Sequence, residues 1–393
     1  MSTARSTRVI MTTLVLVALN LRPVLTSVPV VLGDIEAATG WSDATLGLLT
    51  TLPVLCMGII TLVVATIAAR FGRRRTVAAA LTVLTIALAI RWWADVPVVL
   101  WTSVVLAGVG IALALGLVPG IVREQLPSLI GRATGGWTAA MMTGAAVASA
   151  LTVPLAQALG SWTKALAVWA VVAAMALIVW VKVEGVRHDD TRNARAIHIS
   201  HLPWRNRTAW SLTAYVMVNS FVYYVLVAWI APSSVDRGLS AQTAGWLLGV
   251  FSFAQIFSAL ILTPIVNRLP RRRTGYTVIL VGMCATTLAI GLMPVSSVAL
   301  LFLLGALCGV FVSANYTVGI ALLSEYGGSA LGAARLSAMV LGCTYIVAAF
   351  GPWLAGAFLE ATGAFAWLFA IAAVIGLVQL ATIPALRRGL TVN

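Results

Sequence analysis

The sequence predicts an all-α integral membrane protein, with twelve transmembrane helices arranged as two six-helix halves of the same orientation. Three observations lead to this fold class. Hydrophobic residues make up 61% of the 393-residue chain and charged residues only 9%, whereas a soluble domain carries about 25% charged residues. Apolar runs long enough to cross a bilayer recur along the whole chain. The first half of the sequence also matches the second half at a constant offset.

Charged residues and Gly/Pro-rich breaks divide the chain into twelve apolar runs, each of which predicts one membrane-spanning helix. The runs cover residues 9–33, 43–69, 76–94, 97–122, 133–160, 163–183, 208–234, 242–266, 275–294, 296–323, 332–359 and 364–386. The first run is too long for a secretory signal and shows no small-residue cleavage pattern, so we interpret it as span 1. The four cysteines lie inside the runs without CxxC spacing, which favours buried apolar side chains over a disulfide or a metal site.

The basic residues predict how the helices are oriented. The net charge is +14, and most of the 25 Lys and Arg lie at the two termini and in alternate loops, such as "RFGRRR" (70–75) and "RLPRRR" (268–273). Basic loops stay on the cytoplasmic side, so we expect both termini to be cytoplasmic, in a bacterial inner membrane. This distribution accounts for the positive charge through topology and contact with anionic lipid, and it argues against nucleic acid as a partner.

An internal repeat predicts the two halves. A shift of 198 residues places "GWSDATLGLL" (40–49) over "GLSAQTAGWL" (238–247), and "ARFGRRRT" over "NRLPRRRT". An even number of spans in each half preserves the orientation of the repeat. We therefore expect an N-terminal half at 1–183, a basic cytoplasmic linker at 184–207 and a C-terminal half at 208–393. Parallel repeats of this kind hold a central site near the middle of the membrane.

Span 1 carries a charge at its centre, in the stretch "LVALNLRPVLTSVPVVL" (15–31). Arg22 is roughly 16 to 20 Å from either end of the span, too far for its side chain to reach water. An arginine at this depth costs about 2.5–3.5 kcal/mol, and no Asp, Glu or His lies in the middle of any predicted span. We therefore expect Arg22 to face a wet cavity and to bind a small anion or acceptor group. The alternative is a structural role, in which Arg22 binds carbonyls or hydroxyls of neighbouring spans.

Other polar and aromatic residues within the spans are candidate substrate contacts. The residues that we expect to join Arg22 are Asn20, Thr26, Trp137, Asn219, Tyr223, Asn315, Tyr316 and Tyr345. For each of them, hydrogen bonding or packing between helices is the alternative role. Charged residues at the cytoplasmic ends of the spans are candidates for an intracellular gate, namely Arg70, Arg73, Arg74, Arg123, Glu124, Arg268, Glu325 and Arg335.

Two motifs resemble known transporters. The turn "ATIAARFGRR" (65–74) resembles the loop 2–3 signature of the major facilitator superfamily, Gly-x-x-x-Asp-Arg-x-Gly-Arg-Arg, although Ala65 and Ala69 replace its Gly and Asp. The segment "NLRPVLTSVPVVL" resembles the span 1 motif of the cyanate/2-nitroimidazole permease (CynX/NimT) family. The resemblance implies a secondary transporter that moves a small anionic or polarisable compound by alternating access. It also implies that spans 1, 4, 7 and 10 line the path.

Missing motifs narrow the function further. The sequence has no GxxxxGK[ST] loop, which excludes ATP hydrolysis by this chain. It has no HExxH motif or spaced cysteines, so we expect no enzyme activity and no cofactor. Because the spans lack a central acid, we expect a facilitator, an exchanger, or coupling through the substrate or through the gate acids Glu124 and Glu325. An efflux exporter of neutral or anionic drugs or metabolites is the alternative function, and we expect a monomer in either case.

Overall fold

The structure is a computed structural model, which describes residues 2–126, 129–182, 202–262, 265–266, 272–293 and 297–385. Within these ranges twelve helical segments are long and apolar enough to cross a membrane, which confirms the predicted fold class. The first six segments contain α1 (Ser2–Leu21), α2 (Pro23–Thr26), η1 (Pro29–Val31), α3 (Leu32–Thr39), α4 (Asp43–Phe71), α5 (Arg73–Ala89), η2 (Ile90–Trp93), α6 (Pro97–Gln125), α7 (Ile130–Leu159) and α8 (Trp162–Lys182).

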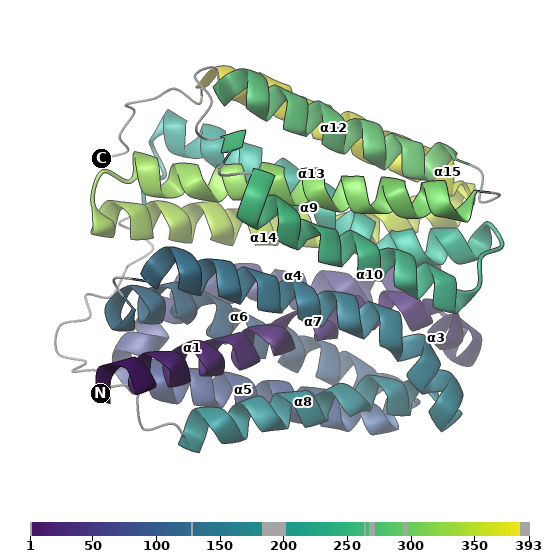
Figure 1. The fold of residues 1–393 in the computed structure, drawn as a ribbon. Coiled ribbons are helices and arrows are strands. Elements are labelled where there is room, and N and C mark those ends of the chain that lie inside the picture. Colours follow the sequence, from purple (N-terminus) through teal and green to yellow (C-terminus); the bar gives the residue numbers. More distant parts are fainter. Residues whose placement is uncertain are drawn as a thin grey trace.

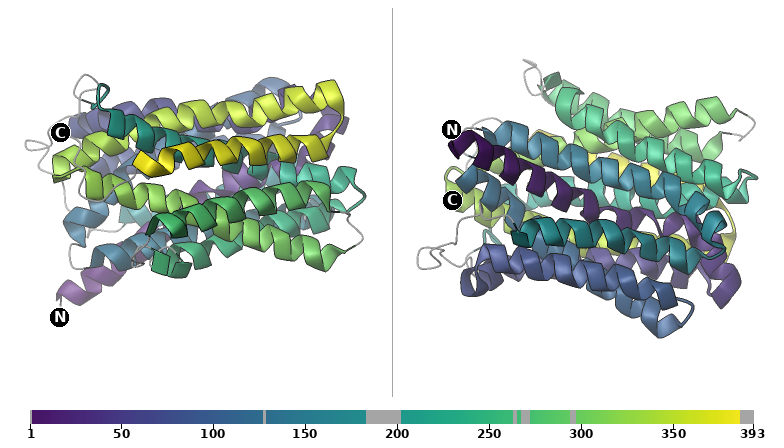
Figure 2. Two further views of the ribbon diagram at one scale, coloured as in Figure 1. Left: turned by 90° about the horizontal axis from the view of Figure 1, so that it is seen from above. Right: turned by 60° about the horizontal axis from the view of Figure 1, so that its bottom comes forward.

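The last six segments contain α9 (Arg207–Asp236), α10 (Ala241–Phe257), η6 (Ser258–Leu262), α12 (Arg272–Leu292), α13 (Val298–Tyr326), α14 (Ala330–Thr362), α15 (Phe365–Leu377) and η7 (Val378–Ala385). The two sets of spans lie side by side along a common axis (Figure 1). Helix α1 begins and η7 ends at the same end of the bundle, called here the terminal end (Figures 1 and 2). The predicted linker falls mostly on residues 183–201, outside the described residues.

Two pairs of helices join the first six spans to the last six. Helix α4 packs against α14, and α7 packs against α10. Small residues let the backbones approach closely: a Cβ atom added to Gly47 of α4 would lie 2.5 Å from the Pro352 carbonyl oxygen of α14. Similarly, a Cβ on Gly245 of α10 would lie 2.6 Å from the Ser149 carbonyl oxygen of α7. Small residues at such positions are typical of helix contacts in membranes.

Residues matched by the internal repeat occupy the same positions in the turns of both sets of spans, although the Ser42 side chain makes no capping bond to the backbone. Gly40 and Gly238 precede α4 and α10, and both have a positive φ, of 66° and 99°. Ser42 and Ser240 are the N-cap residues of these two helices, and the hydroxyl of Ser240 accepts a hydrogen bond from the Thr243 amide at 3.2 Å. A glycine with positive φ followed by an N-cap serine makes a tight turn between antiparallel helices.

Span 1 is broken where the sequence carries its central charge. Helix α1 ends at Leu21, and α2 begins at Pro23. Because proline has no amide hydrogen, the Leu19 carbonyl loses its helical partner. Gly144 of α7 fills the space beside that carbonyl so closely that a Cβ atom would lie 2.1 Å from the Leu19 oxygen. The break in span 1 thus requires a residue without a side chain at position 144.

Span 1 is also longer than predicted. The predicted end at residue 33 is wrong, because the chain continues through η1 and α3 as far as Thr39. The polar residues Asp34 and Glu36 indicated a loop, but they lie on the exposed side of α3, whose buried side carries Leu32 and Ile35. The helix ends at Gly40, whose left-handed conformation provides its C-cap.

Candidate functional site

A cavity of about 170 Å³ lies between the first six spans and the last six. It is lined by Arg22 at the α1–α2 break and by side chains of α7, α9, α10, α13 and α14. Besides Arg22, these are Thr134, Thr138, Met141, Met142, Asn219, Ser220, Tyr223, Tyr224, Gln255, Val312, Ser313, Tyr316, Thr317, Ile320 and Tyr345. The residues from α7 lie in the half of that helix that begins at the terminal end, and those from α13 lie between its middle and its terminal end. The cavity therefore extends from Arg22 towards that end.

Arg22 is the charged residue of this cavity. Its Nη1 atom donates a hydrogen bond to the Tyr223 hydroxyl at 3.1 Å, and its guanidinium carbon lies 5.3 Å from the centre of the Tyr223 ring. No carboxylate lines the cavity among the described residues. A hydroxyl oxygen and a ring face attract a cation but carry no formal charge. The cavity therefore keeps a net positive charge.

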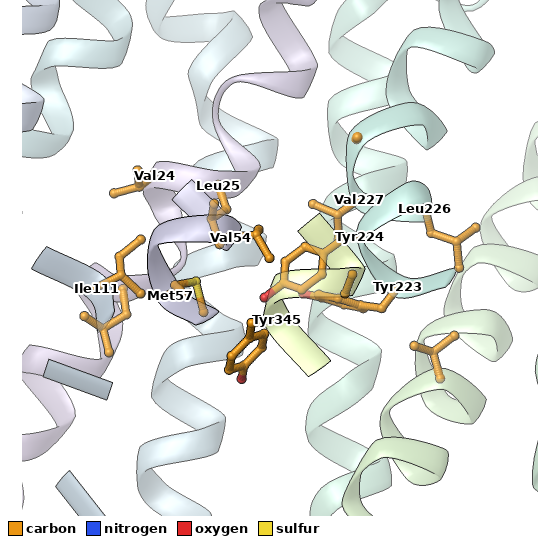
Figure 3. Close-up of a cluster of buried hydrophobic side chains, with 14 of the residues drawn as sticks. Val24, Leu25, Val54, Met57, Ile111, Tyr223, Tyr224, Leu226, Val227 and Tyr345 are labelled. Atoms are coloured by element: carbon orange, nitrogen blue, oxygen red, sulfur yellow. The ribbon is translucent and has the colours of Figure 1, made fainter. Parts of the chain in front are cut away.

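Tyrosines form most of the aromatic surface beside Arg22. The rings of Tyr223 and Tyr224 meet edge to face at 5.1 Å, and the ring of Tyr345 lies 6.4 Å from that of Tyr224. Figure 3 shows these three rings close together, with Val54 and Met57 nearby. The Tyr316 and Tyr345 hydroxyls are 3.2 Å apart.

The hydroxyl of Tyr224 also belongs to the surroundings of Arg22. It is buried and interacts with the Arg22 side chain, but it makes no hydrogen bond of good geometry within the described ranges. Buried hydroxyls are normally well paired. The wall beside Arg22 therefore combines aromatic faces with a weakly bound hydroxyl that a ligand can contact.

The structure brings together part of the predicted set of contacts. Four predicted residues line the cavity with Arg22, namely Asn219, Tyr223, Tyr316 and Tyr345. Four others lie outside its lining, namely Asn20, Thr26, Trp137 and Asn315. The Nδ2 of Asn20 donates to the Leu16 carbonyl within α1, and the hydroxyl of Thr26 donates to the Ala145 carbonyl of α7. Trp137 is buried in α7, and Asn315 is buried behind Asn219. The contacts of Thr26 and Asn315 favour the alternative role of joining helices, whereas the bond of Asn20 stays within α1.

Sequence reasoning missed a set of hydroxyl side chains in the cavity wall. Thr134 and Thr138 of α7 are four residues apart, as are Ser313 and Thr317 of α13. This spacing places each pair on one face of its helix. A search for hydroxyl residues four apart within a span would have found both pairs.

Those predicted gate residues that the structure describes lie at the terminal end. Arg74 donates to the Val181 carbonyl of α8 at 3.1 Å, and the guanidinium of Arg70 lies 5.5 Å from the Phe71 ring centre. Glu325 is exposed at the end of α13, and Arg73 and Arg335 are partly exposed. The side chains of Arg123 and Glu124 and the whole of Arg268 lie outside the described part of the structure. A gating role for these residues stays a prediction.

Acidic residues collect around a second cavity, at the end opposite the termini. This cavity measures about 410 Å³, and its lining includes Asp34 and Glu36 of α3, Asp43 of α4 and Asp236 of α9. None of these carboxylates lines the cavity that holds Arg22. The two cavities therefore have opposite electrostatic character.

Comparison with known proteins places this architecture in a family. The family model of the Major Facilitator Superfamily matches residues 10–240 and 212–389. The chain is 31% identical over 353 residues to the 2-nitroimidazole transporter of Escherichia coli (strain K12), covering 89% of this chain and 88% of that protein. It is 28% identical over 371 residues to the cyanate transport protein CynX of the same organism, covering 93% and 94%.

Solved structures show the same fold at lower identity. A crystal structure of a D-xylose–proton symporter superimposes with a TM-score of 0.74, at 17% identity, covering 95% of this chain and 96% of that chain. A partially occluded inward-open structure of the xylose transporter XylE from E. coli gives a TM-score of 0.75 at 14% identity, covering 95% and 97%. At these identities the likeness concerns the fold alone.

Proposed function

The chain belongs to the Major Facilitator Superfamily and is related to nitroimidazole and cyanate transporters, and from this premise we propose that Arg22 binds the substrate, a small anionic or polarisable compound. The chain is thus a multi-pass membrane transporter with twelve spans. The observation that carries the proposal is the placement of Arg22 in a cavity whose described lining contains no carboxylate.

The electrostatics of the cavity support an anionic or electron-rich ligand. A guanidinium that is deep in a membrane protein is normally paired with an acid or exposed to water. Here it donates a hydrogen bond to the neutral Tyr223 hydroxyl and interacts with the neutral Tyr224 hydroxyl. A ligand that brings negative charge or acceptor atoms neutralises the cation, and the planar donor fork of arginine suits a planar acceptor group.

The size and the walls of the cavity support a small, flat ligand. A volume of about 170 Å³ is below the roughly 300–1,000 Å³ of pockets that bind drug-sized ligands. Aromatic rings such as those of Tyr223 and Tyr345 offer faces and edges to a flat heterocycle. Cyanate and 2-nitroimidazole, which two relatives are named for, share small size and acceptor atoms, and we infer a substrate of that chemical class.

The coupling and the orientation are part of the same proposal. The described lining contains no Asp, Glu or His, which supports a facilitator, an exchanger, or coupling in which a proton travels with the substrate. The basic residues at the terminal end support cytoplasmic termini in a bacterial inner membrane. The cavity then extends towards the cytoplasm. We infer that a single chain suffices, because the cavity is formed within one chain.

The test of this function is exchange of radiolabelled cyanate and of 2-nitroimidazole by purified protein in liposomes. Arg22→Ala and Arg22→Lys should both lose exchange, because lysine lacks the planar fork. The matched control is Arg91→Lys, since Arg91 is a second buried arginine whose Nε donates to the Ser103 hydroxyl, away from the cavity. Wild-type exchange by both Arg22 variants would refute the proposal.

A further inference from the structure

A closed hydrogen-bond network lies behind the cavity wall, between α9, α13 and η7. Its members are Tyr215, Asn219, Asn315 and Gln379, which are 0–1% exposed. Asn315 occupies the centre: its Nδ2 donates to the Asn219 Oδ1 at 3.0 Å and to the Gln379 Oε1 at 2.9 Å, and its Oδ1 accepts from the Tyr215 hydroxyl. Gln379 in turn donates from Nε2 to the backbone carbonyl of Tyr215. Asn219 is the one member that lines the cavity.

The orientation of each amide side chain in this network follows from one acceptor, the backbone carbonyl oxygen of Tyr215. A backbone carbonyl oxygen only accepts hydrogen bonds, so the Tyr215 carbonyl requires Gln379 to face it with its NH₂ group. The oxygen of Gln379 then faces Asn315, which has to donate. The second N–H of Asn315 goes to Asn219, so the oxygen of Asn219 is engaged. Reversing any one amide would bring two oxygens or two NH₂ groups together, and amide orientations are assigned by this criterion.

The fixed direction decides which end of Asn219 faces the cavity. Its oxygen is bound to Asn315, so its NH₂ group is the end left for the cavity. Four residues along the same face of α9, Tyr223 accepts from Arg22. We propose that Gln379 and Asn315 are positioning residues that hold Asn219 as a hydrogen-bond donor towards the substrate. This inference rests on the proposed function, and it adds a second donor to the guanidinium of Arg22.

Such a device would select for ligands that accept hydrogen bonds. An amide side chain can present a donor or an acceptor, and on an exposed surface it rotates between the two. In a buried network each member is held by its partners, because an unpaired buried polar group is costly. The network therefore fixes Asn219 as a donor. In this orientation Asn219 favours ligands with nitro oxygens or a negative charge and disfavours ligands that present an N–H group.

The experiment compares 2-nitroimidazole with 1-methyl-2-nitroimidazole, at a pH low enough to keep the acidic ring N–H of 2-nitroimidazole protonated, so that both probes are neutral. The first carries acceptors and a ring N–H, and the second carries acceptors only. Asn315→Asp removes both donors of Asn315, so Asn219 should turn its NH₂ group towards Asp and its oxygen towards the cavity. The Kd of the methylated probe should rise about tenfold, whereas that of 2-nitroimidazole should rise less because its N–H can pair with the reversed oxygen. The readout is the ratio of the two Kd values in purified protein.

A double variant separates reversal from general damage. Asn219→Leu should raise both Kd values about three- to tenfold, with the ratio unchanged. The double variant Asn219→Leu/Asn315→Asp has no amide at position 219 that could reverse. The ratio of the two Kd values should therefore return to the wild-type value. Thr287→Val is the matched control, since it removes another buried hydroxyl of the same half, 3.7 Å from the Cys308 sulfur, and should leave both affinities within about twofold.

The outcomes distinguish this inference from the function on which it rests. An unchanged ratio of the two Kd values in Asn315→Asp overturns the positioning role. So does a double variant in which the effects of Asn219→Leu and Asn315→Asp on each Kd multiply. If Asn315→Asp does not fold, Gln379→Met tests the same role, because it removes the amide that binds the Tyr215 carbonyl and accepts from Asn315. An unchanged ratio in that variant likewise overturns it. Equal binding of both probes by wild type and Arg22→Lys overturns the proposed function instead.

Discussion

Arg22 at the break in span 1 and Tyr223 in span 7 are joined by a hydrogen bond of 3.1 Å across the boundary between the first six spans and the last six. The bond pairs a permanent cation with a neutral hydroxyl, and it lies at the wall of the cavity. A ligand that enters the cavity with acceptor atoms competes with Tyr223 for the same donor. The pair thus connects the binding of a ligand with the contact between the two sets of spans.

Replacing Tyr223 by phenylalanine should separate these two effects. Tyr223→Phe keeps the ring beside the guanidinium and removes its acceptor, so the ligand-free protein should lose about 1–2 kcal/mol of stability and a few degrees of melting temperature. Saturating cyanate should then raise the melting temperature more than it does in wild type, because the ligand supplies the missing acceptor. Tyr276→Phe is the control, since Tyr276 is buried in α12 and does not line the cavity. A smaller ligand-induced shift in Tyr223→Phe than in wild type would contradict the competition.

The break at Arg22 should depend on Gly144. A Cβ atom on Gly144 would lie 2.1 Å from the Leu19 carbonyl oxygen, so Gly144→Ala should force α7 away from the break and cost about 3 kcal/mol. In the same helix, Gly136 has no atom within 4 Å of its added Cβ, and Gly136→Ala should be tolerated. The measurement is the yield of monodisperse protein together with exchange activity. Equal behaviour of the two variants would mean that the approach of α7 does not hold the break.

The charge on the cavity should not titrate in the physiological range. Arginine stays protonated below about pH 12, and the described lining contains no Asp, Glu or His. The Kd of the neutral probe 1-methyl-2-nitroimidazole should therefore be the same at about pH 6 and pH 8. Titration calorimetry at the two values checks this, with buffers of matched ionic strength. A change of about tenfold would show that an acid or a histidine controls the site.

The sequence predicted the helices well because the bilayer imposes their length and composition. Twelve spans were expected, and the described residues contain twelve candidate spans. The end of span 1 was placed too early because Asp34 and Glu36 lie on the exposed side of a helix. Arg22 was predictable because a charge at the centre of an apolar run has few tolerable environments. The lining of the cavity was less predictable, because it depends on how each helix is rotated about its axis. Asn219 and Asn315 are both buried amides, yet only Asn219 lines the cavity.

The matched turns before α4 and α10 provide a last prediction, on the internal repeat. Gly40 and Gly238 have φ values of 66° and 99°, which side chains with a Cβ disfavour by roughly 1–2 kcal/mol. Gly40→Ala and Gly238→Ala should each destabilise the protein by about that amount, and the double variant by about the sum, because the two turns belong to different sets of spans. Gly33→Ala is the control, since Gly33 has an ordinary φ and no atom within 4 Å of an added Cβ; it should be neutral or slightly stabilising, as alanine favours helix α3. Melting temperatures of the four variants in one detergent test this, and a neutral Gly238→Ala beside a destabilising Gly40→Ala would show that the two turns are not equivalent.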